Sequence, residues 1–75
     1  MQRDIEDVIT FPVHMRPAQA AQYLGVSKSF LDQGRVSGTG PKYVKLSPTV
    51  VIYRRGDLDT FVAARVMRST SEPIL

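Results

Sequence analysis

The sequence predicts a mainly α-helical domain with a small β-hairpin, and three features of the chain carry this prediction. An Ala-rich segment at residues 16–24 has apolar side chains at helical spacing and ends at Gly25. A second helical segment begins at Ser27, directly after that turn. Two short runs at residues 43–46 and 50–53 have the composition of strands and precede a third helical segment. The expected order is helix, tight turn, helix, hairpin, helix.

The size and composition of the chain limit the kinds of protein that it can be. Seventy-five residues make one small domain, and a chain of this size buries only about 60% of its unfolded surface. The absence of Cys excludes disulfides and thiolate metal sites. No segment has the pattern of a signal peptide or the ~20 apolar residues of a membrane span. We therefore expect a cytoplasmic protein that makes no membrane contact.

The two ends of the chain differ from its middle. Residues 1–12 mix acidic and apolar side chains without a clear period, so we expect a flexible N-terminal arm. This arm is either disordered or packs on the core or on a neighbouring copy. Residues 13–67 form the expected domain, and residues 68–75 form a flexible tail. The apolar pair Ile74 and Leu75 could anchor a neighbouring protomer.

The first helix is expected to begin near Arg16, with Pro17 in its first turn, where the missing N–H costs nothing. Gly25 stands where a left-handed C-cap is needed. The apolar stripe of this helix comprises Ala20, Ala21, Tyr23 and Leu24.

The second helix is expected to begin at Ser27, whose hydroxyl can accept from the N–H of Ser29 or Phe30. Phe30 and Leu31 are expected to point inward. At Gly34 either the helix ends or the backbone passes close to another segment. The polar face of this helix comprises Lys28, Ser29, Asp32 and Gln33.

That polar face has the chemistry of base recognition. Gln33 suits adenine, Ser29 is adaptable, and Asp32 can accept from the N4 amino group of cytosine. Arg35 follows at a position suited to a phosphate contact, although Asp32 could instead form a salt bridge with it. The alternative is an ordinary solvated helix face.

The hairpin is expected to join its strands through Ser47-Pro48-Thr49. Val44, Leu46 and Ile52 are candidates for the side that faces the core. Cations gather on or beside the hairpin, either to contact phosphates or to protect exposed strand edges. These cations are Lys42, Lys45, Arg54 and Arg55.

The third helix is expected to begin with Gly56 as its N-cap. Asp57 and Asp59 are expected in its first turn, where the positive end of the helix dipole favours carboxylates. We therefore do not interpret them as a catalytic pair. Its expected buried stripe comprises Leu58, Phe61 and Val62. His14 is the single histidine and no phosphate-binding glycine loop is present. We therefore expect no enzymatic activity, no metal site and no cofactor.

Positive charge is concentrated in the middle of the chain. Residues 13–55 contain seven Lys or Arg against one acid, a net charge of +6. Residues 1–12 carry −2 and residues 56–75 carry −1, which leaves +3 overall. This distribution indicates that the chain binds a polyanion. The alternative is that the cations serve only to keep a small surface solvated. With the expected order of elements, it favours a winged helix-turn-helix that binds double-stranded DNA.

Three segments resemble a known family. AAQYLGVSKSFLD, SGTGPKYVKL and VIYRRGDLDTFV are similar to the winged helix-turn-helix of MerR-like excisionases and AlpA-type phage regulators, over about residues 14 to 66. The resemblance implies that the second helix reads the major groove and that the hairpin is a wing. It implies recognition-helix roles for Ser27, Lys28, Ser29, Asp32 and Gln33. It implies wing roles for residues 45–49, Ser47 and Thr49 included, and for Arg54 and Arg55.

We therefore expect a recombination directionality factor. Its copies would bind repeated sites cooperatively and head to tail, and would direct an integrase toward excision of a mobile element. The alternative is a small transcriptional regulator of a phage or mobile-element promoter that uses the same surface. A protein-interaction module that accepts a partner strand at the hairpin edge is a third possibility.

Overall fold

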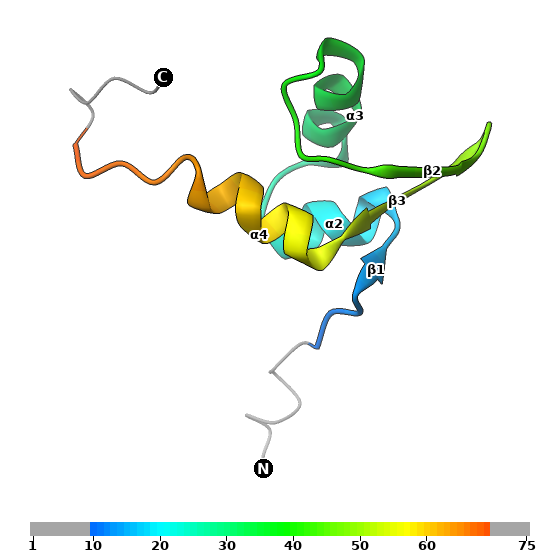
Figure 1. Cartoon of the computed structure of the whole chain (residues 1–75), viewed down its shortest axis with the longest axis horizontal. Helices are drawn as coiled ribbons and strands as arrows, with labels where there is room; N and C mark the ends of the chain where they lie inside the picture. The colour runs from blue at the N-terminus through cyan, green and yellow to red at the C-terminus, as the bar shows by residue number, and fades with distance from the viewer. Residues whose placement is uncertain (1–9, 70–75) are drawn as a thin grey trace.

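The structure is a computed structural model that describes residues 10–69, so the expectations for residues 1–9 and for Ile74 and Leu75 lie outside the described residues. The described part contains three helices and a three-stranded antiparallel sheet, and is therefore of mixed α/β class (Figure 1). In chain order the elements are β1 (His14–Met15), α2 (Pro17–Leu24), α3 (Lys28–Ser37), β2 (Val44–Ser47), β3 (Val50–Arg54) and α4 (Arg55–Ala63).

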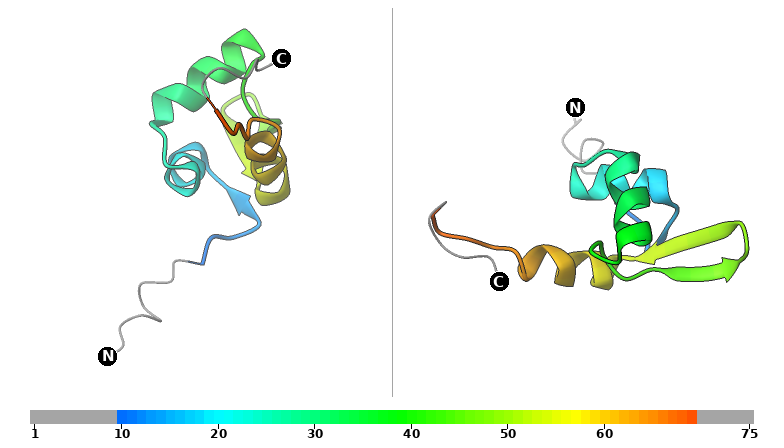
Figure 2. Two further views of the ribbon diagram at one scale, coloured as in Figure 1. Left: turned by 90° about the vertical axis from the view of Figure 1, so that its left-hand side faces the viewer. Right: turned by 90° about the horizontal axis from the view of Figure 1, so that it is seen from above.

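The sheet has one strand more than the sequence predicted. Its order is β1-β3-β2, with His14 opposite Arg54 and Met15 opposite Tyr53. A strand of two residues has no alternation to detect, so no sequence pattern indicated β1. The hairpin β2–β3 projects away from the helices (Figure 2). β1 therefore ties the base of the hairpin to the start of α2.

The core lies between the helices and the base of the sheet. Leu31 and Leu58 are fully buried there, as expected. Phe30 and Val62, which were also expected inside, are 47% and 49% exposed. Phe30 directly precedes the buried Leu31, so it lies about 100° around the helix and points outward. The apolar core cluster comprises Met15, Ala20, Ala21, Leu31, Tyr53 and Leu58.

The core side of the hairpin is the opposite of the one predicted. Tyr53 is fully buried and Val51 packs against the core. Because side chains alternate along a strand, Ile52 and its cross-strand partner Val44 lie on the other face. Leu46 is 61% exposed. Residues 50–53 are all apolar, so the sequence does not indicate which alternate side chains of this strand face the core.

The turn between α2 and α3 forms as the sequence predicts. Pro17 occupies the first helical turn, and Gly25 ends α2 with a left-handed φ of 75°. The N–H of Val26 donates to the carbonyl of Ala21 at 3.0 Å. Ser27 then caps α3, because its hydroxyl accepts from the N–H of Phe30 at 3.1 Å. The two helices are thus joined by three residues, which fixes the direction of α3.

Gly34 lies inside α3 rather than at its end. The helix continues to Ser37 and ends at Gly38, which has a φ of 77°. A Cβ at Gly34 would lie 2.8 Å from the Cα of Gly40. The carbonyl of Gly34 also accepts from the N–H groups of Gly38, Thr39 and Gly40 at 2.9, 3.1 and 3.2 Å. The second of the two expectations for Gly34 is therefore confirmed: the chain folds back directly onto it.

The helix α4 begins one residue before the predicted cap. Arg54 is the N-cap and Arg55 the first helical residue, whereas Gly56 was predicted as the cap. The Nε of Arg54 donates to Asp57 at 2.7 Å, so the capping position and the first turn are joined by a salt bridge. The strand β3 therefore passes into α4 without a loop, and this places Arg54 and Arg55 at the junction.

Candidate functional site

The polar face of α3 points outward. Leu31 and Gly34 are buried on the inner side of the helix. Ser29 and Gln33 are exposed, and neither side chain forms a hydrogen bond within residues 10–69. Ser27, in contrast, uses its hydroxyl to cap the helix. Ser29 and Gln33 are thus the α3 side chains most available to a ligand.

Three charged side chains of α3 bond to one another. The Nζ of Lys28 contacts Asp32 Oδ2 at 3.0 Å, and a guanidinium nitrogen of Arg35 contacts Asp32 Oδ1 at 2.8 Å. These pairs have i,i+4 and i,i+3 spacing, which brings side chains together on one face of a helix. The salt bridge between Asp32 and Arg35 considered from the sequence is therefore present. Each carboxylate oxygen of Asp32 holds one cation.

This arrangement keeps Asp32 ionised. The hydrogen bond from Lys28 is the main cause of the lowered pKa of Asp32, partial desolvation opposes it, and Arg35 lowers the pKa further. The pKa of Arg35 is raised, chiefly because its guanidinium donates to the hydroxyl of Tyr53. Near neutral pH the α3 face therefore presents an ionised carboxylate between two cations.

Arg35 turns toward the protein. Its other terminal nitrogen donates to the hydroxyl of Tyr53 at 2.7 Å, and its side chain is only 22% exposed. The guanidinium carbon also lies 5.9 Å from the ring centres of both Tyr43 and Tyr53. The phosphate contact expected of Arg35 thus competes with three protein contacts. Sequence reasoning missed both tyrosines, because the wrong hairpin face was assigned to the core.

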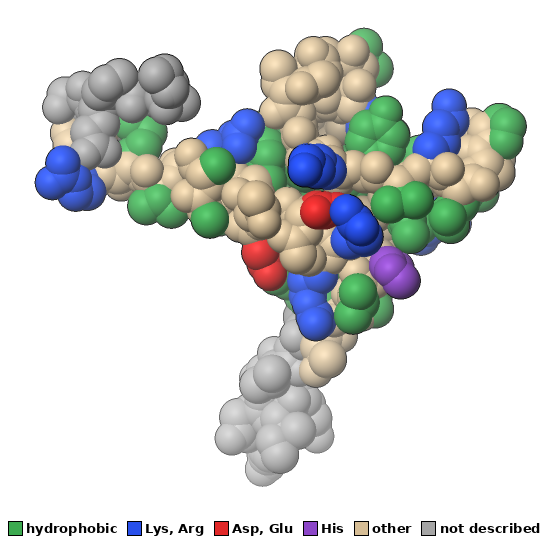
Figure 3. All heavy atoms as spheres, in the orientation of Figure 1, with side chains coloured by type: hydrophobic (Ala, Val, Ile, Leu, Met, Phe, Trp, Pro, Cys, Tyr) green, Lys and Arg blue, Asp and Glu red, His purple; other side chains and the backbone are tan. Residues whose placement is uncertain are grey.

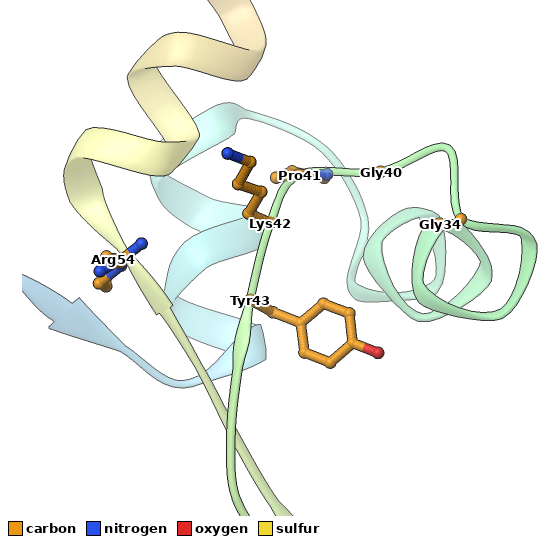
Figure 4. Close-up of a pocket in the computed structure, with 7 residues that line it drawn as sticks. Gly34, Gly40, Pro41, Lys42, Tyr43 and Arg54 are labelled. Atoms are coloured by element: carbon orange, nitrogen blue, oxygen red, sulfur yellow. The ribbon is translucent and has the colours of Figure 1, made fainter.

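The four cations expected at the hairpin do not form one surface. Lys45 lies opposite Val51, so it shares the face of Tyr53 and α3. Tyr43 turns toward α3, whereas Lys42 and Arg54 point to the side on which α4 begins (Figure 4). Arg55 donates to the carbonyl of Phe11 at 2.6 Å and is half-buried. Alternation along the strands therefore separates residues that are close in sequence.

The availability of these cations also differs. Arg54 is held by Asp57, whereas the side chains of Lys42 and Lys45 have no partner within residues 10–69. On the face seen in Figure 3 the cations lie in separate spots, with acidic side chains near the centre. At the hairpin tip the N–H of Thr49 donates to the hydroxyl of Ser47 at 3.3 Å. Lys45 is therefore the available hairpin cation on the α3 side.

A hollow of about 390 Å³ lies between the C-terminal end of α3 and the hairpin (Figure 4). Two cations, Lys42 and Arg54, border it, and the close contact of Gly34 with Gly40 forms part of its wall. Its remaining lining residues are Gly38, Pro41 and Tyr43. Of these groups Lys42 suits contact with an anion, because it has no partner in the described part of the chain, whereas Arg54 is held by Asp57.

The described residues contain no cluster of three or more His, Cys, Asp or Glu side chains that could hold a metal ion. None of the helices within residues 10–69 is long and apolar enough to cross a membrane. Comparison of the chain with models of known protein families finds no match, and comparison with curated proteins finds none either.

Proposed function

We propose that this chain is a winged helix-turn-helix DNA-binding protein of the excisionase kind. In this proposal α3 is the recognition helix and the hairpin β2–β3 is the wing. The observation that carries it is the exposed polar face of α3, held by the turn at Gly25, beside a projecting hairpin whose Lys45 has no partner among the described residues. The major groove of B-DNA, about 12 Å wide, admits such a helix.

The residues divide into those that read bases and those that contact phosphates. Gln33 can form two hydrogen bonds with adenine, and the hydroxyl of Ser29 can donate to or accept from the edge of a base. Asp32 accepts from the N4 amino group of cytosine. Lys45 supplies a phosphate contact on the same side as α3, and Lys42 supplies one on the other side of the hairpin. Arg55 is engaged with Phe11 and contributes little directly.

The proposal extends to recombination because the motifs of this domain resemble those of excisionases. A single module buries roughly 600–1,000 Å² of its surface on DNA, so specific binding requires several copies. Copies bound head to tail on repeated sites would bend the DNA and direct an integrase toward excision. In this role the chain is a DNA-binding factor without catalytic activity or cofactor.

A nuclease footprint of the purified protein over the DNA around its own gene tests this proposal. We expect adjacent protected sites in the same orientation, filled cooperatively. Sites at an attachment region beside an integrase gene support excision, whereas sites that overlap a promoter support transcriptional regulation. No protection of any duplex at low salt would overturn both.

Two matched lysine variants test the proposed orientation. Lys42 and Lys45 both lack a partner within residues 10–69 but lie on different sides of the hairpin. We expect Lys45→Gln to weaken duplex binding more than Lys42→Gln. Equal losses, or a larger loss for Lys42→Gln, would contradict docking through the α3 side. Unchanged binding by both variants would favour a surface that recognises protein rather than DNA.

A further inference from the structure

Within residues 10–69 the hydroxyl of Tyr53 has one hydrogen-bond partner, Arg35 of α3. Tyr53 is fully buried, and its hydroxyl accepts from Arg35 at 2.7 Å. A buried hydroxyl without a partner destabilises the fold, so this bond constrains both side chains. It also spans 18 positions of sequence and joins α3 to β3.

Arg35 makes this connection through Tyr53 and Tyr43, and its bond to Asp32 holds the guanidinium in place within α3. One terminal nitrogen bonds Tyr53, the other bonds Asp32 at 2.8 Å, and the guanidinium lies near the ring of Tyr43 on the chain leading into β2. The guanidinium is planar, so two bonds in fixed directions define its orientation. Arg35 therefore sets the position of α3 relative to both strands of the hairpin.

We propose that Arg35 is a positioning residue for DNA recognition and that it contacts no phosphate. This inference rests on the proposed DNA-binding function. Arg35 fixes the angle between the recognition helix and the wing, and it aims the carboxylate of Asp32 toward the bases. A phosphate would have to compete with the bonds that Arg35 makes to Tyr53 and Asp32, and it would approach a side chain that is only 22% exposed.

Asp32 is the group through which this positioning acts on DNA. An ionised carboxylate offers about four acceptor positions, and Lys28 and Arg35 occupy only two of them. The side chain is 38% exposed, so the remaining positions can reach a donor. A negative charge disfavours phosphates and accepts from cytosine N4, so Asp32 contributes sequence preference rather than general affinity.

The salt dependence of DNA binding separates positioning from phosphate contact. The slope of log K against log salt changes by about 0.9 for each phosphate that the protein neutralises. For Arg35→Gln we expect an unchanged slope, a loss of about tenfold on the chain's own site and unchanged binding to unrelated duplexes. For the control Lys45→Gln we expect a slope reduced by about 0.9 and weaker binding to every sequence.

Two further variants address the role of Arg35 and the stability of the fold. Arg35→Lys keeps the charge but loses the planar guanidinium whose two nitrogens bond Asp32 and Tyr53 in fixed directions, so we expect it to resemble Arg35→Gln. Tyr53→Phe removes one hydroxyl and keeps the buried ring, so it leaves a folded chain in which the same tether is broken. In thermal unfolding without DNA, we expect the double variant Arg35→Gln/Tyr53→Phe to melt close to Arg35→Gln alone.

Two results would overturn the inference. One is a slope reduced by about 0.9 in Arg35→Gln together with full rescue by Arg35→Lys, which would mark a phosphate contact. The other is strictly additive losses of melting temperature for Arg35→Gln and Tyr53→Phe, which would show that the two side chains are not coupled. A wild-type chain that binds no duplex at low salt would instead overturn the proposed function, and with it the DNA role of Arg35.

Discussion

The charged side chains of α3 and those of the hairpin β2–β3 are used in different ways. On α3, Lys28, Asp32 and Arg35 bond to one another and to Tyr53. On the hairpin, Lys45 has no partner within residues 10–69, and Arg54 at the end of β3 is held by Asp57 from α4. The comparison shows that a count of cations along the sequence overstates the charge available to a ligand. Salt bridges and strand alternation decide which cations can bind.

The two regions differ in packing as well. The helix α3 is anchored by the fully buried Leu31 and by the backbone contact at Gly34. The hairpin leaves Leu46 61% exposed near its tip and projects from the domain. We therefore expect the position of α3 to depend on the fold and the tip of the hairpin to tolerate substitution.

Matched leucine truncations should give the largest difference between the regions. We expect Leu31→Ala to lower the free energy of unfolding by about 2–5 kcal/mol, because it leaves a cavity beneath α3. We expect Leu46→Ala to change it by about 0.5 kcal/mol or less, because its side chain is already solvated. Denaturant unfolding measures both. Similar losses would show that Leu46 is packed as tightly as Leu31.

Matched glycine substitutions test the contact that positions α3. The Cβ of Gly34→Ala would press on the backbone at Gly40, so we expect a loss of about 1–3 kcal/mol. A Cβ at Gly56 meets no atom within 4 Å, and alanine favours helices, so Gly56→Ala should gain about 0.5–1 kcal/mol. Thermal melts can compare the two. A stabilising Gly34→Ala would contradict the close approach of the loop.

Local signals in the sequence predicted most of the fold. Pro17, Gly25 and Ser27 each act through their own backbone or a neighbouring N–H, so their positions define α2, the turn and the start of α3. The face of the hairpin could not be predicted, because residues 50–53 are apolar on both sides. The strand β1 could not be predicted either, since two residues of strand exist only through pairing with β3.

The candidate site could be predicted only where local spacing along the chain determines it. Helical spacing placed Ser29, Asp32 and Gln33 on one outward face, as found. The contact of Arg35 with Tyr53 joins residues from two elements and depends on the strand register, which the sequence left open. The division of Lys42 and Lys45 between two sides of the hairpin depends on the same register.

Two serines near the start of α3 have different proposed roles, Ser27 in capping the helix and Ser29 in recognition of DNA. Ser27→Ala removes the cap on the N–H of Phe30, so we expect a loss of about 1 kcal/mol in the free energy of unfolding. Ser29→Ala removes an exposed hydroxyl without a bond within residues 10–69, so we expect unchanged stability and altered sequence preference on DNA. Thermal unfolding and binding to single-base variants of the site measure these effects. Equal destabilisation would contradict the assigned cap.

The smallest effect concerns the pH dependence of the α3 network. Folding lowers the pKa of Asp32, so its ionised form stabilises the folded chain. That contribution is complete above the unfolded carboxylate pKa of about 3.9 and is lost as the pH falls through the lower folded pKa. We expect the stability difference between wild type and Asp32→Asn to be constant near neutral pH and to shrink in acid. A difference that grows in acid would contradict the network.

The most direct test of the account is to titrate the isotopically labelled chain with a short duplex and follow its backbone amide signals by nuclear magnetic resonance. We expect the largest shifts in α3 from Lys28 to Gln33 and in the hairpin from Lys45 to Thr49, with small shifts in the last turn of α4. Shifts confined to α4 and the exposed side of α2, or none at low salt, would contradict DNA recognition by α3 and the hairpin.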